Sequence, residues 1–229
     1  MAGKHRPGVR LTFWVGLTMI LAGLVMVGYV GWQFYGTNWT SHREQRQVTR
    51  SLEAQWERGG SRLLPRYVPK GDASAIIRVP AFGASYAVPV LEGTSTTVLA
   101  RGYGHFSSGA DPGQVGNYTL AAHRVTHGEP LRRMPELRPG DKILVETVEA
   151  TYTYVLDTDP NALVIPFTGV WVLQPVPKNP EPGGAQPAQR AGQRLITLTT
   201  CAELFHTDER MIAFGHLVAT QKKPAALSG

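Results

Sequence analysis

The stretch Leu195-Ile196-Thr197-Leu198-Thr199-Thr200-Cys201 decides the fold of this chain. It alternates apolar and hydroxyl side chains and is rich in β-branched residues, which is the pattern of a half-buried β-strand. Successive side chains of a strand point to opposite faces of the sheet. One face would carry Ile196, Leu198 and Thr200, and the other Thr197, Thr199 and Cys201. The stretch therefore predicts a strand that ends in a thiol.

Similar short runs recur on both sides of this strand, separated by Gly, Pro, Asn and Asp. Such spacing, with little helix, favours a mainly β fold and a closed or nearly closed β-barrel. A short helical turn is expected at 131–137, a glycine-rich loop at 102–116 and a long loop without periodicity at 178–192. The expected strands are residues 75–79, 86–90, 117–122, 142–147, 151–157, 170–176, 195–200 and 211–219.

An apolar segment, Leu11–Trp32, precedes the barrel and contains no charged residue. Its 22 residues would form a helix of about 33 Å, long enough to cross a bilayer. A cleaved signal peptide is the alternative, but its apolar region would be shorter and would end at a small-residue cleavage site. We expect an uncleaved anchor over residues 11–35. Arginines and lysines flank both ends, so charge alone does not set the orientation.

A spacer is expected between the anchor and the barrel, at residues 36–72. Val48, Leu52 and Trp56 recur every fourth residue among charges, which predicts an amphipathic helix that packs on the domain or lies on the membrane. Glycines and prolines follow it. The complete division is a basic segment 1–10, the anchor 11–35, the spacer 36–72, the catalytic domain 73–222 and a disordered tail 223–229.

The amino-acid composition limits the classes of function that this chain can have. The net charge of +6 and 42% hydrophobic residues fit a domain with a real core and an affinity for anionic surfaces. Nucleic-acid binding would need clustered basic residues and a recognisable motif, and neither is present. The single cysteine excludes an internal disulfide framework. On composition alone, a buried structural cysteine is the simpler interpretation of Cys201.

Two further residues favour a reactive cysteine instead. His123 ends the expected strand 117–122, where a barrel can project a side chain into a site, and it could act as the acid or base for the Cys201 thiol. Arg210, nine positions after Cys201, could bind a substrate carbonyl or stabilise an oxyanion. A solvated charge at a strand end is the alternative for Arg210. A zinc site is disfavoured because no close pair of ligands includes Cys201.

These motifs resemble those of the sortase family of cysteine transpeptidases. Thr-Leu-Thr-Thr-Cys201 matches its TLxTC motif, the Gly-Asn-Tyr-Thr-Leu-Ala-Ala-His123 run matches the strand that carries its histidine, and Arg210 matches its arginine. The flanking Pro-Gly-Gln-Val-Gly-Asn and Trp-Val-Leu-Gln-Pro-Val-Pro are similar to the class E branch of actinobacteria. One departure is Ala122, where many members have glycine; it affects packing rather than acid–base chemistry.

The resemblance implies a sortase-type closed β-barrel with a few short helices, behind an N-terminal transmembrane helix. It also implies the following expectations. Cys201 is the nucleophile, His123 the general acid and base, and Arg210 the stabiliser of substrate and oxyanion, with Ala122, Thr199 and Thr200 in the substrate groove. The substrates are secreted proteins with a C-terminal Leu-Ala-x-Thr-Gly-like signal, and the acceptor is a peptidoglycan precursor amine. The N-terminus lies in the cytoplasm and the catalytic domain outside.

No cofactor is expected, and no metal, because the 102–116 loop offers only Asp111 as an acidic ligand. Two alternatives remain open, and a third, an L,D-transpeptidase, is disfavoured. The chain could be an extracellular cysteine peptidase with the same Cys-His pair, or an anchored binding module without catalysis. An L,D-transpeptidase would show a glycine-flanked cysteine, whereas Thr199 and Thr200 precede Cys201.

Overall fold

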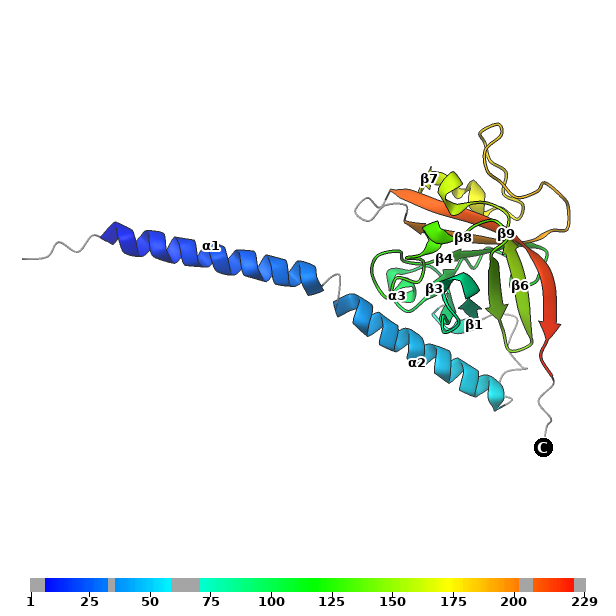
Figure 1. Cartoon of the computed structure of the whole chain (residues 1–229), viewed down its shortest axis with the longest axis horizontal. Coiled ribbons are helices and arrows are strands. Elements are labelled where there is room, and N and C mark those ends of the chain that lie inside the picture. The colour runs from blue at the N-terminus through cyan, green and yellow to red at the C-terminus, as the bar shows by residue number, and fades with distance from the viewer. Residues whose placement is uncertain (1–6, 33–35, 59–70, 202–207, 225–229) are drawn as a thin grey trace, which may run out of the picture.

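The computed structural model describes residues 7–32, 36–58, 71–201 and 208–224 (Figure 1). Two long helices lead into a compact β domain. The helices are α1 (Pro7–Gly31), α2 (Thr37–Glu57) and α3 (Thr96–Leu99), with 3₁₀ turns η2 (Pro80–Phe82), η3 (Met134–Glu136), η4 (Pro160–Ala162) and η5 (Val170–Leu173). The strands are β1 (Ala73–Arg78), β2 (Val88–Glu92), β3 (Tyr103–His105), β4 (Gly116–Ala121), β5 (Lys142–Glu146), β6 (Ala150–Leu156), β7 (Val164–Pro166), β8 (Arg194–Cys201) and β9 (Glu209–Lys222).

The strands close into a barrel. Their order is β6-β5-β1-β2-β3-β4-β8-β9, and β9 pairs back onto β6, while β7 pairs with β9 outside this ring. Two neighbouring pairs are parallel, β2 with β3 and β4 with β8, and the others are antiparallel. Closure removes the unpaired edges that an open sheet would expose. The predicted closed β-barrel is confirmed.

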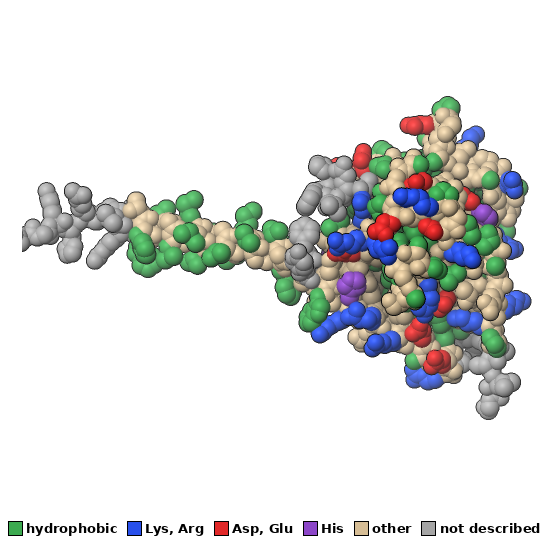
Figure 2. Space-filling view, in the orientation of Figure 1, with side chains coloured by type: hydrophobic (Ala, Val, Ile, Leu, Met, Phe, Trp, Pro, Cys, Tyr) green, Lys and Arg blue, Asp and Glu red, His purple; other side chains and the backbone are tan. Residues whose placement is uncertain are grey.

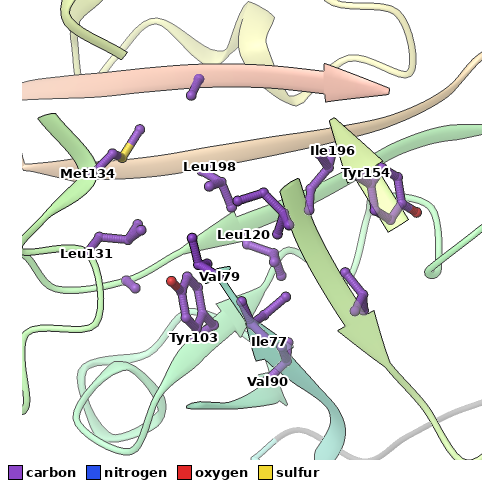
Figure 3. Close-up of a cluster of buried hydrophobic side chains, with 14 of the residues drawn as sticks. Ile77, Val79, Val90, Tyr103, Leu120, Leu131, Met134, Tyr154, Ile196 and Leu198 are labelled. Carbon is purple, nitrogen blue, oxygen red and sulfur yellow. The ribbon is translucent and has the colours of Figure 1, made fainter. Parts of the chain in front are cut away.

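The interior of the barrel is filled by alternate side chains of its strands. Ile196 and Leu198 of β8 point into it together with Leu120 of β4, as the alternation predicts (Figure 3). Tyr103 and Tyr154 are among the largest fully buried side chains. Each side chain of this size removed from water contributes about 1.5–3 kcal/mol to folding. This core holds β4 and β8 in a rigid register next to each other.

A second, smaller core covers the outer face of the barrel at β8 and β9. Ile212 and Phe214 of β9 pack there against Ile165 of β7 and Val172 of η5. Trp171 lies at 5.9 Å from the Phe214 ring, centroid to centroid. The segment from β7 to η5 therefore forms a wall above the strand that carries Cys201.

The two N-terminal helices have different surfaces. The segment Thr12–Gly31 of α1 has a mean hydropathy of 2.1, is long and apolar enough to cross a membrane, and is not buried against the rest of the described structure (Figures 1 and 2). Helix α2 lies against the barrel, and Arg78 of β1 pairs with its Glu53 at 2.8 Å. The predicted amphipathic helix is present, and of the two settings considered it packs on the domain.

The sequence prediction of the strands was wrong at three places, one of which is the three-residue strand β7 (Val164–Pro166), which was not expected. Residues 170–173 form the 3₁₀ turn η5 and residues 174–176 form no strand, because the carbonyls of Val172 and Gln174 accept hydrogen bonds from the Asn117 side chain rather than from a neighbouring strand. The expected loop 102–116 contains the short strand β3, whose three residues were too few to show a period. The glycines and prolines expected to follow the amphipathic helix fall largely in residues 59–70. These residues, and residues 225–229 of the expected tail, lie outside the described residues.

Candidate active site

Strand β8 places Cys201 at its end, on the face outside the barrel core. Thr197, on the same face, donates a hydrogen bond of 2.7 Å from its hydroxyl to Oδ1 of Asn117 on β4. Thr200 faces the other way and donates to the carbonyl of Ala122 at 2.8 Å. The hydroxyl groups of Thr197 and Thr200 can stay buried because each finds an acceptor on the neighbouring segment.

His123 follows the end of β4, beside the end of β8. The parallel register pairs Ala121 with Thr199, and the next residue, Ala122, donates its amide to the Thr199 carbonyl at 3.1 Å. Arg124 then donates from Nη1 to the Cys201 carbonyl at 3.4 Å. These bonds tie the backbone on both sides of His123 to the end of β8. Two residues that are far apart in sequence, His123 and Cys201, are thus held at neighbouring strand ends.

Arg210 enters from the third strand. It is the register partner of Cys201 in the antiparallel β8–β9 pair, at the start of β9. Its Nη1 donates to the carbonyl of Glu209 at 3.0 Å, which is one of its interactions. A guanidinium presents several N–H groups in a fixed plane, a geometry that suits binding to a carbonyl or carboxylate oxygen.

The three strand ends open into one cavity of about 350 Å³. All six residues expected at the site, Cys201, His123, Arg210, Ala122, Thr199 and Thr200, line this cavity. The segment from β7 to η5 forms one wall of the cavity. Helix α3 and the residue that follows β3 form another wall. The apolar members of these walls are Ile165, Phe167, Val170, Val172 and Leu173 on one side and Leu99 and Phe106 on the other. The lining thus combines apolar side chains with a thiol, an imidazole and a guanidinium.

The surroundings of His123 favour its neutral form. Burial, and then the neighbouring His127, lower the pKa of His123 to about 4. Among the described residues, no carboxylate lines the cavity to stabilise an imidazolium. At neutral pH this imidazole is uncharged, and it can accept a proton from a thiol.

This pKa predicts a pH-dependent stability. Between pH 6.5 and about 4, the unfolded chain binds a proton at His123 that the folded protein does not bind. The free energy of unfolding should therefore be intact above pH 6.5 and fall as the pH is lowered to about 4. Replacing His123 with glutamine should flatten this fall in melting temperatures measured from pH 7 to 4. His42, whose pKa burial also lowers, retains part of the slope in both proteins. Curves that stay parallel would contradict the prediction.

Three residues near the site were not identified from the sequence. Asn117 is 1% exposed and holds η5 over the cavity, and a polar residue inside an apolar strand was the available signal. Arg124 directly follows His123, yet only the structure shows its bond to the Cys201 carbonyl. The His127 ring stacks on the His123 ring at 4.8 Å between centroids, with an interplanar angle of 27°. No local sequence pattern predicts that the two histidine rings stack.

Within residues 7–32, 36–58, 71–201 and 208–224, no group of three or more His, Cys, Asp or Glu side chains is placed to hold an ion. The chemistry available at the cavity is that of a thiol, an imidazole and a guanidinium.

Known proteins are similar to this chain in sequence and in fold. Sortase SrtE1 of Streptomyces coelicolor is 34% identical over 242 residues, covering 99% of this chain and 64% of that protein, so this chain spans less than two thirds of that relative. The structure of sortase E from Streptomyces avermitilis is 38% identical with a TM-score of 0.60, over 70% of this chain and all of that one. Sortase E1 from Streptomyces coelicolor with a tripeptide in the active site is 34% identical with a TM-score of 0.57, over 69% and 98%.

The family model described as the sortase domain matches residues 77–218. This range covers more than half of the chain and contains His123, Cys201 and Arg210. The closed barrel and the sequence similarity agree with that match. The chain belongs to the sortase family.

Proposed function

We propose that this chain is a membrane-anchored cysteine transpeptidase of the class E type. It cleaves a Leu-Ala-x-Thr-Gly-like sorting signal between threonine and glycine, and it transfers the protein to a peptidoglycan amine. The observation that carries this proposal is the convergence of Cys201, His123 and Arg210 on one cavity from three strand ends. A class E relative with a tripeptide in its active site supports a peptide as the occupant.

The first half of the reaction makes a thioester. The neutral His123 takes the thiol proton while the Cys201 sulfur attacks the carbonyl carbon of the threonine. Arg210 donates hydrogen bonds to the oxyanion that forms on that carbonyl. The imidazolium then gives its proton to the amide nitrogen as the carbon–nitrogen bond breaks. The glycine fragment leaves as an amine, and the acyl group stays on the sulfur.

The second half restores the enzyme. The amine of the peptidoglycan precursor attacks the thioester carbonyl, the carbon–sulfur bond breaks, and a new amide forms. The surplus proton of the amine passes through His123 to the sulfur of Cys201. Transfer prevails over hydrolysis where the amine reaches the thioester before water does. The apolar side chains of Val172 and Leu173 that line the same cavity support this order.

The orientation in the membrane is part of the same proposal. Residues 11–35 anchor the chain, the N-terminus lies in the cytoplasm, and the barrel lies outside, where sorting substrates and wall precursors meet. The apolar helix Thr12–Gly31 supports the anchor. The packing of α2 on the barrel supports a short, defined distance between the cavity and the bilayer, because α2 follows α1 closely.

One assay separates the proposal from its closest alternative. The full chain in detergent is incubated with a Leu-Ala-x-Thr-Gly peptide, with and without a glycine-type amine, and the products are identified by mass spectrometry. We expect the new amide to be the main product when the amine is present. Hydrolysis alone in both reactions would identify a cysteine peptidase instead. A peptide with threonine replaced by alanine controls for recognition of the signal.

A further inference from the structure

The loop that follows His123 has an unusual backbone. His127, Gly128 and Glu129 have φ values of 55°, 78° and 46°, so three successive residues are left-handed. Histidine enters this region more readily than most side chains, glycine enters it freely, and glutamate does not. Such a conformation persists only where surrounding contacts hold it.

Helix α2 supplies those contacts through two side chains. Asn38 accepts a hydrogen bond from the Gly128 amide at 3.0 Å, and it donates to the Glu129 carboxylate and to the Val125 carbonyl. Gln45 donates to the His127 carbonyl at 3.1 Å. A Cβ at Gly128 would stand 2.5 Å from Nε2 of Gln45, so the helix side chain lies directly on the loop. Helix α2 and the loop are therefore joined by several side-chain hydrogen bonds.

The face of α2 that is buried against the domain is mostly polar. The sequence pattern pointed to Val48, Leu52 and Trp56 as the packing face. Leu52 is buried, but the rest of the fully buried stripe is polar: Ser41, Gln45 and Thr49. A helix that only needed to pack would bury apolar residues along this stripe. Polar side chains there cost desolvation unless they bond. Gln45 bonds the loop that carries His127, whereas the buried Thr49 hydroxyl has no hydrogen-bond partner in the described part of the chain.

The loop in turn lies against the acid–base residue. The His127 ring stacks on the His123 ring with centroids 4.8 Å apart, while His123 lines the cavity with Cys201 and Arg210. Other charged or titratable groups lie on the elements packed around the two histidines. The loop carries Arg124 and the ion pair of Glu129 with Arg132, and α2 carries His42 and Arg46.

We propose that His127, held in place by Asn38 and Gln45, is a positioning residue for His123, so that the juxtamembrane helix α2 is part of the catalytic apparatus. This inference rests on the proposed function of His123. The stacked ring fixes the plane of the His123 imidazole toward Cys201. It also opposes a positive charge on His123, because a second imidazole is placed against its face.

The test uses the full chain in detergent and two independent ways to disturb the contact. The first is the double variant Asn38→Ala with Gln45→Ala, which acts from the helix. The second is His127→Asn, which keeps a residue that tolerates left-handed backbone but removes the ring. Gln47→Ala is the matched control, because Gln47 is the same residue type on the exposed face of α2. Melting temperatures establish that each variant is folded.

Two readouts are taken. In protein labelled with ¹³C at histidine Cε1, the titration of His123 is followed by NMR and assigned with His123→Gln. We expect it to move upward, toward pH 6.5, in both test variants and to stay unchanged in Gln47→Ala. In the peptide assay, kcat should fall by about 10- to 100-fold in both test variants while KM stays within about twofold, because α2 does not line the cavity.

The titration decides the inference even if the proposed function fails, because it needs no turnover. A His123 titration that coincides with the wild type in both folded variants overturns the positioning role, whatever the rates. An upward shift in a protein that turns over no sorting peptide would uphold the contact between helix and histidine and refute the transpeptidase proposal alone.

Discussion

Replacement of Cys201 with alanine is expected to lower the rate of peptide cleavage by at least about a thousandfold, because the acyl group then has no sulfur to bind. The neighbouring hydroxyl of Thr200 does not offer a substitute nucleophile, since it donates its proton to the Ala122 carbonyl. In wild-type protein quenched with acid during turnover, intact mass spectrometry should show the added acyl fragment. The variant should show none.

The control for this variant is substrate binding. Removal of one sulfur from a half-buried position leaves the apolar walls of the cavity unchanged, so a fluorescent sorting peptide should still bind. Binding without cleavage identifies Cys201 as the reacting group. Full biological function in the folded Cys201→Ala protein would instead support an anchored binding module.

Replacement of Arg210 with lysine is expected to reduce kcat/KM by about 100- to 1000-fold, which is typical of the loss of an oxyanion donor. Lysine keeps the positive charge but not the planar fork of N–H groups. The position is demanding because Arg210 sits directly opposite Cys201 in the β8–β9 pair. Steady-state kinetics with the same peptide and amine measures the effect.

A matched arginine separates this role from a general effect of charge. Arg190 lies exposed in the long loop between η5 and β8, so Arg190→Ala should leave kcat/KM unchanged. A Arg210→Lys protein that is folded and retains more than about a third of the wild-type kcat/KM would contradict a role in oxyanion stabilisation.

The strand that carries the thiol was predictable because its pattern is local. The alternation in 195–201 determines which side chains enter the core and which face outward, and β8 follows it. The strand before His123 was predictable for the same reason. Recognition of the family motifs around Cys201, His123 and Arg210 named the residues that the barrel then brings to one cavity.

What could not be predicted depends on partners far away in the chain. Residues 170–176 have the composition of a strand, yet their carbonyls bond to Asn117, more than fifty positions earlier. The left-handed backbone at His127 depends on side chains of α2, which are more than eighty positions earlier. Helix periodicity identified the apolar part of the buried face of α2 and missed its polar part, because apolar periodicity does not register buried hydrogen bonds.

The parallel pairing of β4 with β8 has a consequence for how the protein folds. The bond between Thr200 and Ala122 joins residues 78 positions apart, and two parallel pairs of this kind require the chain to cross the barrel before they form. Folds dominated by such non-local pairings have a high contact order and fold slowly, in milliseconds to seconds. No short fragment contains both sides of the cavity, because its lining residues extend from Thr94 to Ile212. The reactive thiol of Cys201 therefore gains its partners His123 and Arg210 only when the whole barrel has formed. Recovery of enzymatic activity during refolding would thus follow completion of the barrel.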